Sequence, residues 1–248
     1  MNKEIKEQII QSLIDQKEIF GDELFEENIL NSEKNSTRKT KIKKDEKNIE
    51  VSKDLFVERE NWEKAKTLDE LERLINTCTK CPLHKNRNKF VFGKGNPNAD
   101  VMVVGEGPGA EEDKQGEPFV GRAGKLLTDI LNAIKFSREE VYIANVVKSR
   151  PPGNRTPNAE EMEACLPYLK KQIALIKPKL ILCLGLTAAQ GVLKKKDSLT
   201  KMRGQVFDFE GTKVMVTYHP AALLRNPNWK RPAWEDVQQF RKLYDEIK

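Results

Sequence analysis

The sequence lacks any long apolar run, since none reaches the roughly 18 residues that a membrane-spanning helix needs. Its first residues, Met1-Asn2-Lys3-Glu4, also lack the apolar core of a signal peptide. Cysteine is scarce, with four residues, and histidine scarcer, with two. We therefore expect a cytoplasmic, monomeric protein with no membrane association, whose cysteines serve as thiols or metal ligands more than as disulfides.

Charge is abundant and unevenly distributed along the chain. Charged residues make up 33% of the 248 residues, and the formal net charge is +6. Such an excess of cations suits a polyanionic partner such as nucleic acid, although a lysine-rich surface also serves solubility alone.

The composition changes near residue 60, which predicts a charged extension over residues 1–60 and a folded domain over residues 61–248. Residues 33–48 hold seven Lys or Arg against three acids and one aliphatic side chain, too little apolar surface to fold. Ile5, Ile9 and Leu13 recur at helical spacing and predict one or two short amphipathic helices. The extension is then a largely disordered or helical tether, a sequence-blind DNA arm, or a docking segment for a partner protein.

From residue 100 onward, short apolar runs alternate with segments of helical periodicity. Runs that are apolar on both faces are typical of parallel strands covered by helices on each side. The sequence therefore predicts an α/β fold with three layers, α/β/α. The four apolar runs are 101–104, 141–144, 180–184 and 214–218.

Polar residues follow three of these four runs. Glu106 lies in the loop Gly105-Glu106-Gly107-Pro108-Gly109, Asn145 ends the second run, and His219 follows the fourth. Because ligands bind beyond the carboxyl ends of the strands in open α/β sheets, we expect these residues to meet in one crevice.

The glycine-rich loop also admits a dinucleotide-binding interpretation, as in an oxidoreductase. Its spacing is not G-x-G-x-x-G, Pro108 stiffens it, and Glu106 would place a negative charge beside a pyrophosphate. A loop of small residues that presents a carboxylate fits chemistry on a neutral substrate better.

The other strand-end residues suit recognition of a base. The amide of Asn145 can accept a hydrogen bond from a ring N–H and donate one to a carbonyl, which matches uracil and not cytosine. The segment after His219 carries Leu224 and Arg225, an apolar wedge beside a cation of the kind that base-flipping enzymes insert into DNA. Alone, His219 would more often be a hydrogen-bonded structural residue, Asn145 a turn-former and the Leu224 segment a buried turn.

Taken together, the motifs resemble those of the family-4 uracil-DNA glycosylases, the iron–sulfur branch of the uracil-DNA glycosylase superfamily. The resemblance runs from about Thr77 to the C-terminus. It implies a four-stranded parallel sheet between helices and a DNA-repair hydrolase of base excision repair, which flips uracil out of DNA, cuts its N-glycosidic bond and leaves an abasic site. The motifs are Gly105–Gly109 with Glu112-Asp113, Pro118–Gly124, Arg150-Pro151-Pro152 and His219-Pro220-Ala221.

The resemblance also implies roles for individual residues. Glu106 and His219 are the expected catalytic residues, with His219 beside uracil O2, and Gly107 lines the reacting side of the pocket. Glu112 lies in a loop that shapes the uracil site and excludes thymine, and the split of roles between Glu106 and Glu112 stays open. The remaining expectations are that Phe119 stacks on the flipped base, that Asn145 reads its edge, and that Leu224 and Arg225 belong to the DNA-inserting loop.

The resemblance further implies a [4Fe–4S] cluster, and here the chain departs from the family pattern. Cys78, Cys81 and Cys165 match three ligand positions, whereas Ser149 stands at the fourth, directly before Arg150-Pro151-Pro152. Four alternatives are open: Ser149 ligates as an alkoxide, three thiolates hold the cluster, the cluster is absent, or Cys78, Cys81, His84 and Cys165 bind zinc. We favour a retained cluster.

Cys183 lies within an apolar run, which predicts a buried core thiol and not a ligand.

Three alternative functions remain at this point. The first is a non-catalytic DNA-binding module that holds iron–sulfur or zinc. The second is a glycosylase for another base, such as hypoxanthine or mismatched thymine. The third is the dinucleotide-dependent oxidoreductase.

Overall fold

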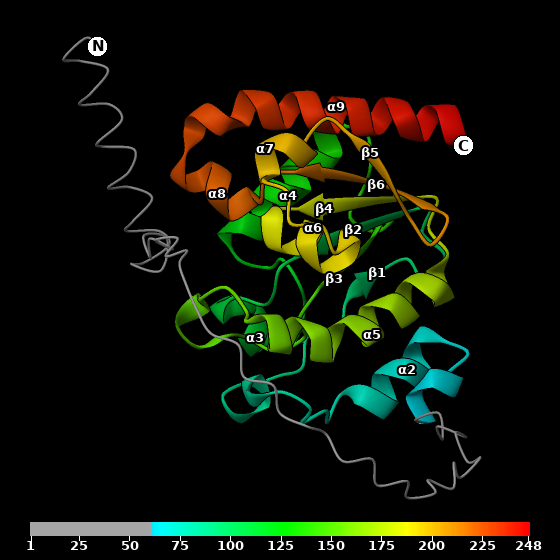
Figure 1. Cartoon of the computed structure of the whole chain (residues 1–248), viewed down its shortest axis with the longest axis vertical. Helices are drawn as coiled ribbons and strands as arrows, with labels where there is room; N and C mark the ends of the chain where they lie inside the picture. The colour runs from blue at the N-terminus through cyan, green and yellow to red at the C-terminus, as the bar shows by residue number, and fades with distance from the viewer. Residues whose placement is uncertain (1–60) are drawn as a thin grey trace, which may run out of the picture. The chain divides into compact units, whose positions relative to one another are not determined.

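The computed structural model describes residues 61–248, drawn in colour in Figure 1. The helices, the basic stretch and the DNA or protein contacts predicted for residues 1–60 lie outside the described residues. None of the helices between residues 61 and 248 is both long and apolar enough to cross a bilayer.

One six-stranded sheet organises the described residues, with the strand order β1-β3-β2-β4-β6-β5. The four central strands β3, β2, β4 and β6 run parallel, whereas β1 and β5 are antiparallel edges. The strands are β1 (Lys94–Gly95), β2 (Val101–Gly105), β3 (Tyr142–Asn145), β4 (Leu180–Leu184), β5 (Val206–Phe209) and β6 (Thr212–Thr217).

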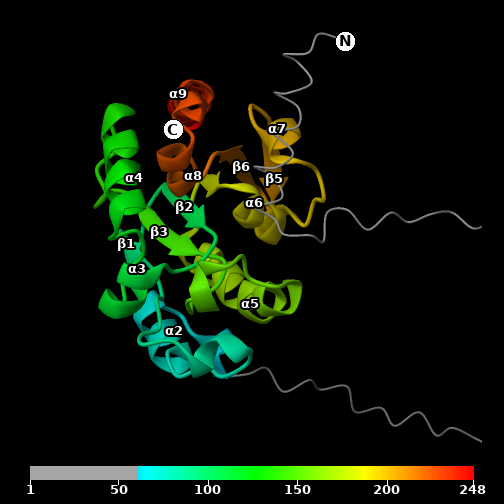
Figure 2. The same cartoon turned by 90° about the vertical axis from the view of Figure 1, so that its left-hand side faces the viewer.

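Helices cover both faces of this sheet (Figure 2). Alternate residues of β2 face opposite layers: Val101 and Val103 pack with α4 and α9, whereas Met102 and Val104 pack with α2, α5 and α6. The helices are α2 (Leu68–Ile75), α3 (Ala110–Gln115), α4 (Arg122–Ala133), α5 (Ala159–Ile176), α6 (Leu186–Leu193), α7 (Leu199–Met202), α8 (Pro220–Arg225) and α9 (Lys230–Ile247). Four 3-10 helices join them: η2 (Asn61–Lys64), η3 (Pro82–Lys85), η4 (Pro152–Asn154) and η5 (Pro227–Trp229).

The predicted α/β/α architecture with four parallel strands is therefore confirmed, and the two edge strands are additions to it. Strand β1 is only two residues long and exposed, so it leaves no apolar pattern in the sequence. Strand β5 joins β6 through a tight turn at Glu210 and Gly211, where φ is 51° and 86°. Two successive positive φ values are typical of the hairpin turns that match strand twist.

Candidate active site

The loops that follow the parallel strands meet beyond the carboxyl ends of these strands. Asn145 ends β3 directly opposite Gly105 of β2, which places it beside Glu106. Strands β2 and β4 are neighbours in the sheet, and the Gly185 N–H after β4 donates to the Thr217 carbonyl of β6 at 2.8 Å. His219 comes two residues after Thr217. The sheet thus brings Glu106, Asn145 and His219 together beyond the carboxyl ends of its parallel strands.

Asn145 carries an unusual buried acceptor. Its side chain is buried, and its Oδ1 is the only buried side-chain nitrogen or oxygen among residues 61–248 that lacks a hydrogen-bond partner. Leaving a buried acceptor unpaired costs about 1–3 kcal/mol. An N–H donor on a bound ligand would relieve that cost.

The absence of a side chain at Gly105 makes room for two of the site residues. A Cβ atom there would lie 2.4 Å from Asn145 Oδ1 and 2.6 Å from Phe119 Cζ. Both distances are shorter than van der Waals contact, so only glycine lets the amide and the ring approach this strand end. Gly107 is equally confined, because its Cβ would lie 2.6 Å from Val147 Cγ2.

Phe119 and His219 face one another across the site. Their ring centroids lie 5.5 Å apart with an interplanar angle of 30°, which is a stacked arrangement. The Phe119 side chain is buried and its backbone is left-handed, with φ of 55°. Such a conformation in a bulky residue is rare and needs support from its surroundings.

Glu112 supplies that support from helix α3. Its Oε1 accepts hydrogen bonds from the backbone N–H groups of Val120 and Gly121, both at 3.0 Å, and its Oε2 accepts from Gly109 N–H at 3.1 Å. Both carboxylate oxygens are therefore engaged with backbone donors. Glu112 ties the glycine-rich loop to the loop that carries Phe119.

His219 is held in one tautomer. Its Nδ1 accepts a hydrogen bond from Ala221 N–H at 3.1 Å, at the start of helix α8. Burial of the ring, followed by the positive charge of Arg225, lowers the pKa of His219 to about 4, against a smaller opposing effect of Glu112. The imidazole is neutral near pH 7, and because Nδ1 is the acceptor, the proton resides on Nε2, which is a hydrogen-bond donor.

Glu106 lies half-buried beyond β2. Burial raises the pKa of its carboxyl, whereas a hydrogen bond with the Thr187 hydroxyl and the positive charge of Arg225 lower it. Thr187 belongs to the first turn of α6, where helix N–H groups also favour a negative charge. The Thr187 hydroxyl therefore stabilises the ionised form of the Glu106 carboxyl, whereas burial disfavours that form.

The predicted inserting residues lie on α8. Leu224 is 43% exposed although it is a large apolar residue, and Arg225 beside it is also exposed. Arg225 is close enough to Glu106 and His219 to affect the pKa of both. The structure thus places α8, which carries the residues predicted to insert, next to the candidate site.

Cys78 and Cys81 precede β1 and pack in the same layer as Cys165, which lies on α5. Cys78 Sγ lies 3.3 Å from the hydroxyl oxygen of Tyr168, and the Cys81 thiol is hydrogen-bonded to the thiol of Cys165 on α5. This hydrogen bond is the largest cause that lowers the pKa of Cys81, to about 6. Cys183 is buried in β4, as predicted for a core thiol, and burial raises its pKa to about 12.

Ser149 is engaged by an arginine. Arg87 Nη1 donates to Ser149 Oγ at 3.2 Å and to the Cys78 carbonyl at 2.7 Å, while Nη2 donates to the Asn76 carbonyl at 3.2 Å. The charge of the guanidinium would favour an alkoxide, but its N–H already takes up one side of the Ser149 oxygen. Among the four residues at the expected ligand positions, Cys78, Cys81 and Cys165 carry the thiols that iron–sulfur clusters take as ligands, and the Ser149 oxygen already accepts a hydrogen bond.

The zinc alternative finds no support in the geometry. No three cysteine, histidine, aspartate or glutamate side chains in the described part of the chain lie close enough to hold a single metal ion. The imidazole of His84 instead lies with Nδ1 2.7 Å from the carbonyl oxygen of Cys81.

Sequence reasoning missed three residues that hold the site. Thr187 contacts Glu106, and Arg87 contacts Ser149. Lys148 is fully buried, and its Nζ donates to the Asn145 carbonyl at 2.9 Å and to Gln172 Oε1 at 2.6 Å. A buried lysine leaves no local signal, because its partners lie far away in the sequence or on the backbone.

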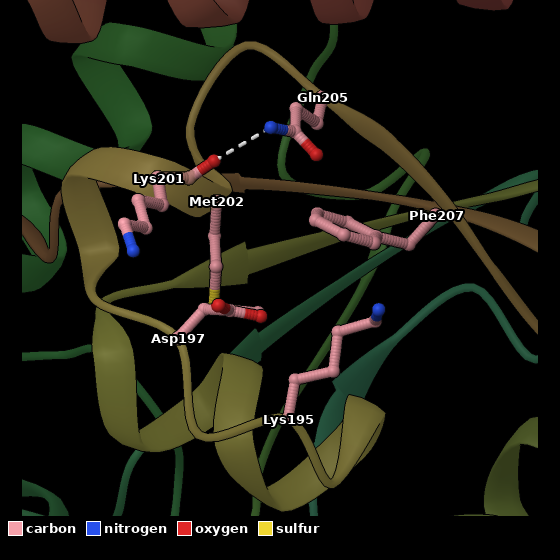
Figure 3. Close-up of a pocket in the computed structure, with 6 residues that line it drawn as sticks. All are labelled: Lys195, Asp197, Lys201, Met202, Gln205 and Phe207. Carbon is pink, nitrogen blue, oxygen red and sulfur yellow. Dashed lines mark hydrogen bonds between the residues drawn. The ribbon is translucent and has the colours of Figure 1, made fainter.

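A separate hollow of about 230 Å³ lies beside the edge strand β5, between α7 and β5 (Figure 3). Gln205 Nε2 donates to the Lys201 carbonyl at 2.8 Å on its rim. None of the predicted site residues lines this hollow, so it is not the candidate active site. Its lining consists of Lys195, Asp197, Lys201, Met202, Gln205 and Phe207.

Comparisons with known proteins identify the family of this chain. The family model described as the uracil DNA glycosylase superfamily matches residues 92–238. The type-4 uracil-DNA glycosylase of Thermotoga maritima is 49% identical over 173 residues, or 68% of this chain and 90% of that protein. The type-4 uracil-DNA glycosylase of Pyrobaculum aerophilum is 46% identical over 181 residues, or 70% of this chain and 92% of that protein. The chain therefore belongs to the uracil-DNA glycosylase superfamily and, within it, to the type-4 uracil-DNA glycosylases.

Proposed function

We propose that this protein is a DNA-repair enzyme that hydrolyses the N-glycosidic bond of uracil in DNA and leaves an abasic site. The observation that carries the proposal is the unpartnered buried Oδ1 of Asn145, which lies at the same strand end as Phe119, whose ring stacks on the neutral imidazole of His219. A flipped uracil supplies the N3–H that this oxygen lacks and an O2 acceptor for the imidazole. Cytosine has no hydrogen on N3 and would leave Oδ1 unpaired.

His219 acts on the leaving group. When the bond between C1′ and uracil N1 breaks, the electron pair goes to the base, and negative charge develops on O2. The Nε2–H of neutral His219 donates to this oxygen in a partly desolvated place, where a positioned donor is typically worth about 10²–10³ in rate. Phe119 stacks on the flipped base and fixes its plane relative to His219 and Asn145.

Glu106 acts on the other side of the sugar, next to Gly107. As a carboxylate it orients the attacking water, stabilises the positive charge on the sugar, and takes a proton as the new bond from C1′ to water oxygen forms. Glu112 has a different role, because its two oxygens hold the backbone of residues 109, 120 and 121. It shapes the uracil site, and with it the exclusion of thymine, by positioning the Phe119 loop. Leu224 and Arg225 enter the duplex as the base leaves it.

Cys78, Cys81 and Cys165 are the proposed ligands of a [4Fe–4S] cluster, with Ser149 outside the ligand set. When bound, the cluster supplies a structural bridge between the segment that precedes β1 and helix α5. None of the proposed chemistry at Glu106 and His219 passes through it.

The test is a glycosylase assay on labelled oligonucleotides that contain uracil, thymine or hypoxanthine at one position. Alkali after incubation should cleave the strand at uracil and leave thymine and hypoxanthine intact. Binding without cleavage would favour the DNA-binding module, and cleavage at hypoxanthine or mismatched thymine would change the substrate. An oxidoreductase would leave every strand uncut.

A further inference from the structure

A pair of stacked aromatic rings lies just outside the candidate pocket. The rings of Tyr218 and Trp229 have centroids 5.0 Å apart and an interplanar angle of 18°. Trp229 is nevertheless 38% exposed, so the indole still presents a large area to solvent. Large exposed apolar side chains next to a binding site are typical of interaction surfaces. We call these two residues the aromatic platform.

Polar contacts around Tyr218 hold the aromatic platform in place. The Arg203 guanidinium lies over the Tyr218 ring at 4.4 Å. Asp236 holds Arg203 by hydrogen bonds of 2.7 and 2.9 Å, and it also accepts from the Thr217 hydroxyl at 2.7 Å. An arginine held by a buried carboxylate is a fixed support for a stack. The indole of Trp229 is therefore a preorganised surface.

The position of the platform relative to the pocket is fixed by the chain. Tyr218 directly precedes His219. The backbone N–H of Trp229 donates to the Asn226 carbonyl at 3.1 Å, just beyond the end of α8. Figure 1 shows α8 and the beginning of α9 at the same end of the molecule. The platform thus lies directly next to the proposed inserting residues Leu224 and Arg225.

Exposed cations continue this surface. Lys230 and Arg231 follow Trp229, and both are exposed. Arg231 contacts Glu235 at 3.6 Å, and within residues 61–248 Lys230 forms no ion pair. Cations beside an exposed aromatic ring match the two features of a nucleic-acid strand, its phosphates and the faces of its bases. An apolar protein partner would not need them.

We propose that Trp229 stacks on a base of the DNA strand next to the flipped nucleotide, while Lys230 and Arg231 contact the adjoining phosphates. This inference rests on the proposed function, because DNA is the substrate in both. It adds a second contact to the strand, outside the pocket and distinct from the inserting residues. Because unpaired bases are free to stack on the indole, single-stranded DNA gains more from this contact than duplex DNA.

Binding measurements on a stable product analogue test the stacking. The probe is a fluorescent oligonucleotide with a tetrahydrofuran abasic site, as a single strand and as a duplex, followed by anisotropy. Base–aromatic stacking is worth about 1–3 kcal/mol, so Trp229→Ala should weaken binding to the single strand about tenfold, and binding to the duplex less. Trp229→Phe should recover most of the loss, because it keeps an aromatic face.

Trp234→Ala is the matched control, since Trp234 is 40% exposed on α9, the helix that begins directly after Trp229, but is not part of the platform. It should bind both probes as the wild type does. Unchanged binding by Trp229→Ala would overturn the inference. So would an equal loss on single strand and duplex, or an equal loss in the Trp234→Ala protein.

The salt dependence separates stacking from phosphate contact. Lys230→Ala should reduce the slope of log affinity against log salt by about one, whereas Trp229→Ala should leave the slope as it is. A reduced slope in Trp229→Ala would contradict stacking. The wild-type assay on uracil keeps the two proposals apart: failure to release uracil refutes the proposed function, whereas release of uracil with unaltered binding by Trp229→Ala refutes only the platform.

Discussion

The pocket at the strand ends and the cysteine region beside α5 are held together by different kinds of contact. In the pocket, Glu112 and His219 bind backbone N–H groups, so their positions follow from the course of the chain. In the cysteine region, Cys78 lies against the Tyr168 side chain and Cys81 against Cys165, while Arg87 joins Ser149 to Cys78.

The two regions should therefore respond differently to substitution. A contact between two side chains can be exchanged for another that spans the same gap. A residue bound by several backbone donors has no such substitute. Glu112, which is bound in this way, should matter for stability. Changes at the unpartnered Asn145 amide and at His219 should affect rate more than stability, and changes in the cysteine region should affect stability more than rate.

The largest expected effect is that of His219→Ala. Loss of the donor to uracil O2 should lower single-turnover uracil release by about 10²–10³, with the fold retained. The matched control is His84→Ala, which removes the other histidine and should keep the wild-type rate. A wild-type rate in purified His219→Ala would refute the assigned role.

Asn145→Leu should separate rate from stability most sharply. Leucine has the same number of side-chain heavy atoms as asparagine and removes an acceptor that is buried and unpaired, so the melting temperature should stay level or rise. Uracil release should fall by more than tenfold, because the N3–H of uracil loses its partner. Calorimetry with the glycosylase assay checks both. A large fall in melting temperature would show that the amide has a structural partner. It would contradict the difference expected between the candidate site and the cysteine region.

Arg87→Met tests the cysteine region. It removes three hydrogen bonds from a charged donor and should lower the free energy of unfolding by about 2 kcal/mol. For a domain of this size that corresponds to a melting temperature lower by about 5 °C. Lys85→Met, an exposed lysine on η3, is the control and should melt as the wild type does. Equal melting temperatures for both variants would contradict the prediction.

Thr187→Val should move the acid limb of the pH–rate profile to higher pH. Thr187 lowers the pKa of Glu106, so removal of its hydroxyl raises that pKa and protonates the carboxylate at a higher pH. The pKa of His219 is lowered to about 4, so His219 stays neutral across the same range and does not set this limb. Single-turnover rates of uracil release, measured between pH 5 and 8 for the wild type and Thr187→Val, test this shift. A shift to lower pH, or none, would remove Thr187 from the site.

The smallest effect is expected for Ser149→Ala. If Ser149 lies outside the ligand set, this variant should contain as much iron as the wild type after anaerobic purification, whereas Cys81→Ala should contain less. Iron analysis and absorbance near 400 nm measure both. Iron loss in Ser149→Ala comparable to that in Cys81→Ala would make Ser149 a ligand. A wild type free of iron would refute the proposed cluster.

Several features of the protein were determined by its sequence alone. Parallel strands buried on both faces leave apolar runs, so the central strands, the layers and the polar residues at the strand ends could all be predicted. Glu106, Asn145 and His219 could be singled out because each directly follows such a run. The motifs around them were specific enough to predict the family.

Only the tertiary structure decided the rest, because it depends on contacts between distant residues. Arg87 and Ser149 lie 62 positions apart, and no spacing rule connects them. The support of Trp229 by Tyr218 and the hydrogen bond from Thr187 to Glu106 depend likewise on how separate segments pack. Local sequence patterns record burial and backbone conformation, whereas the pairing of side chains across the fold is a property of the packed chain.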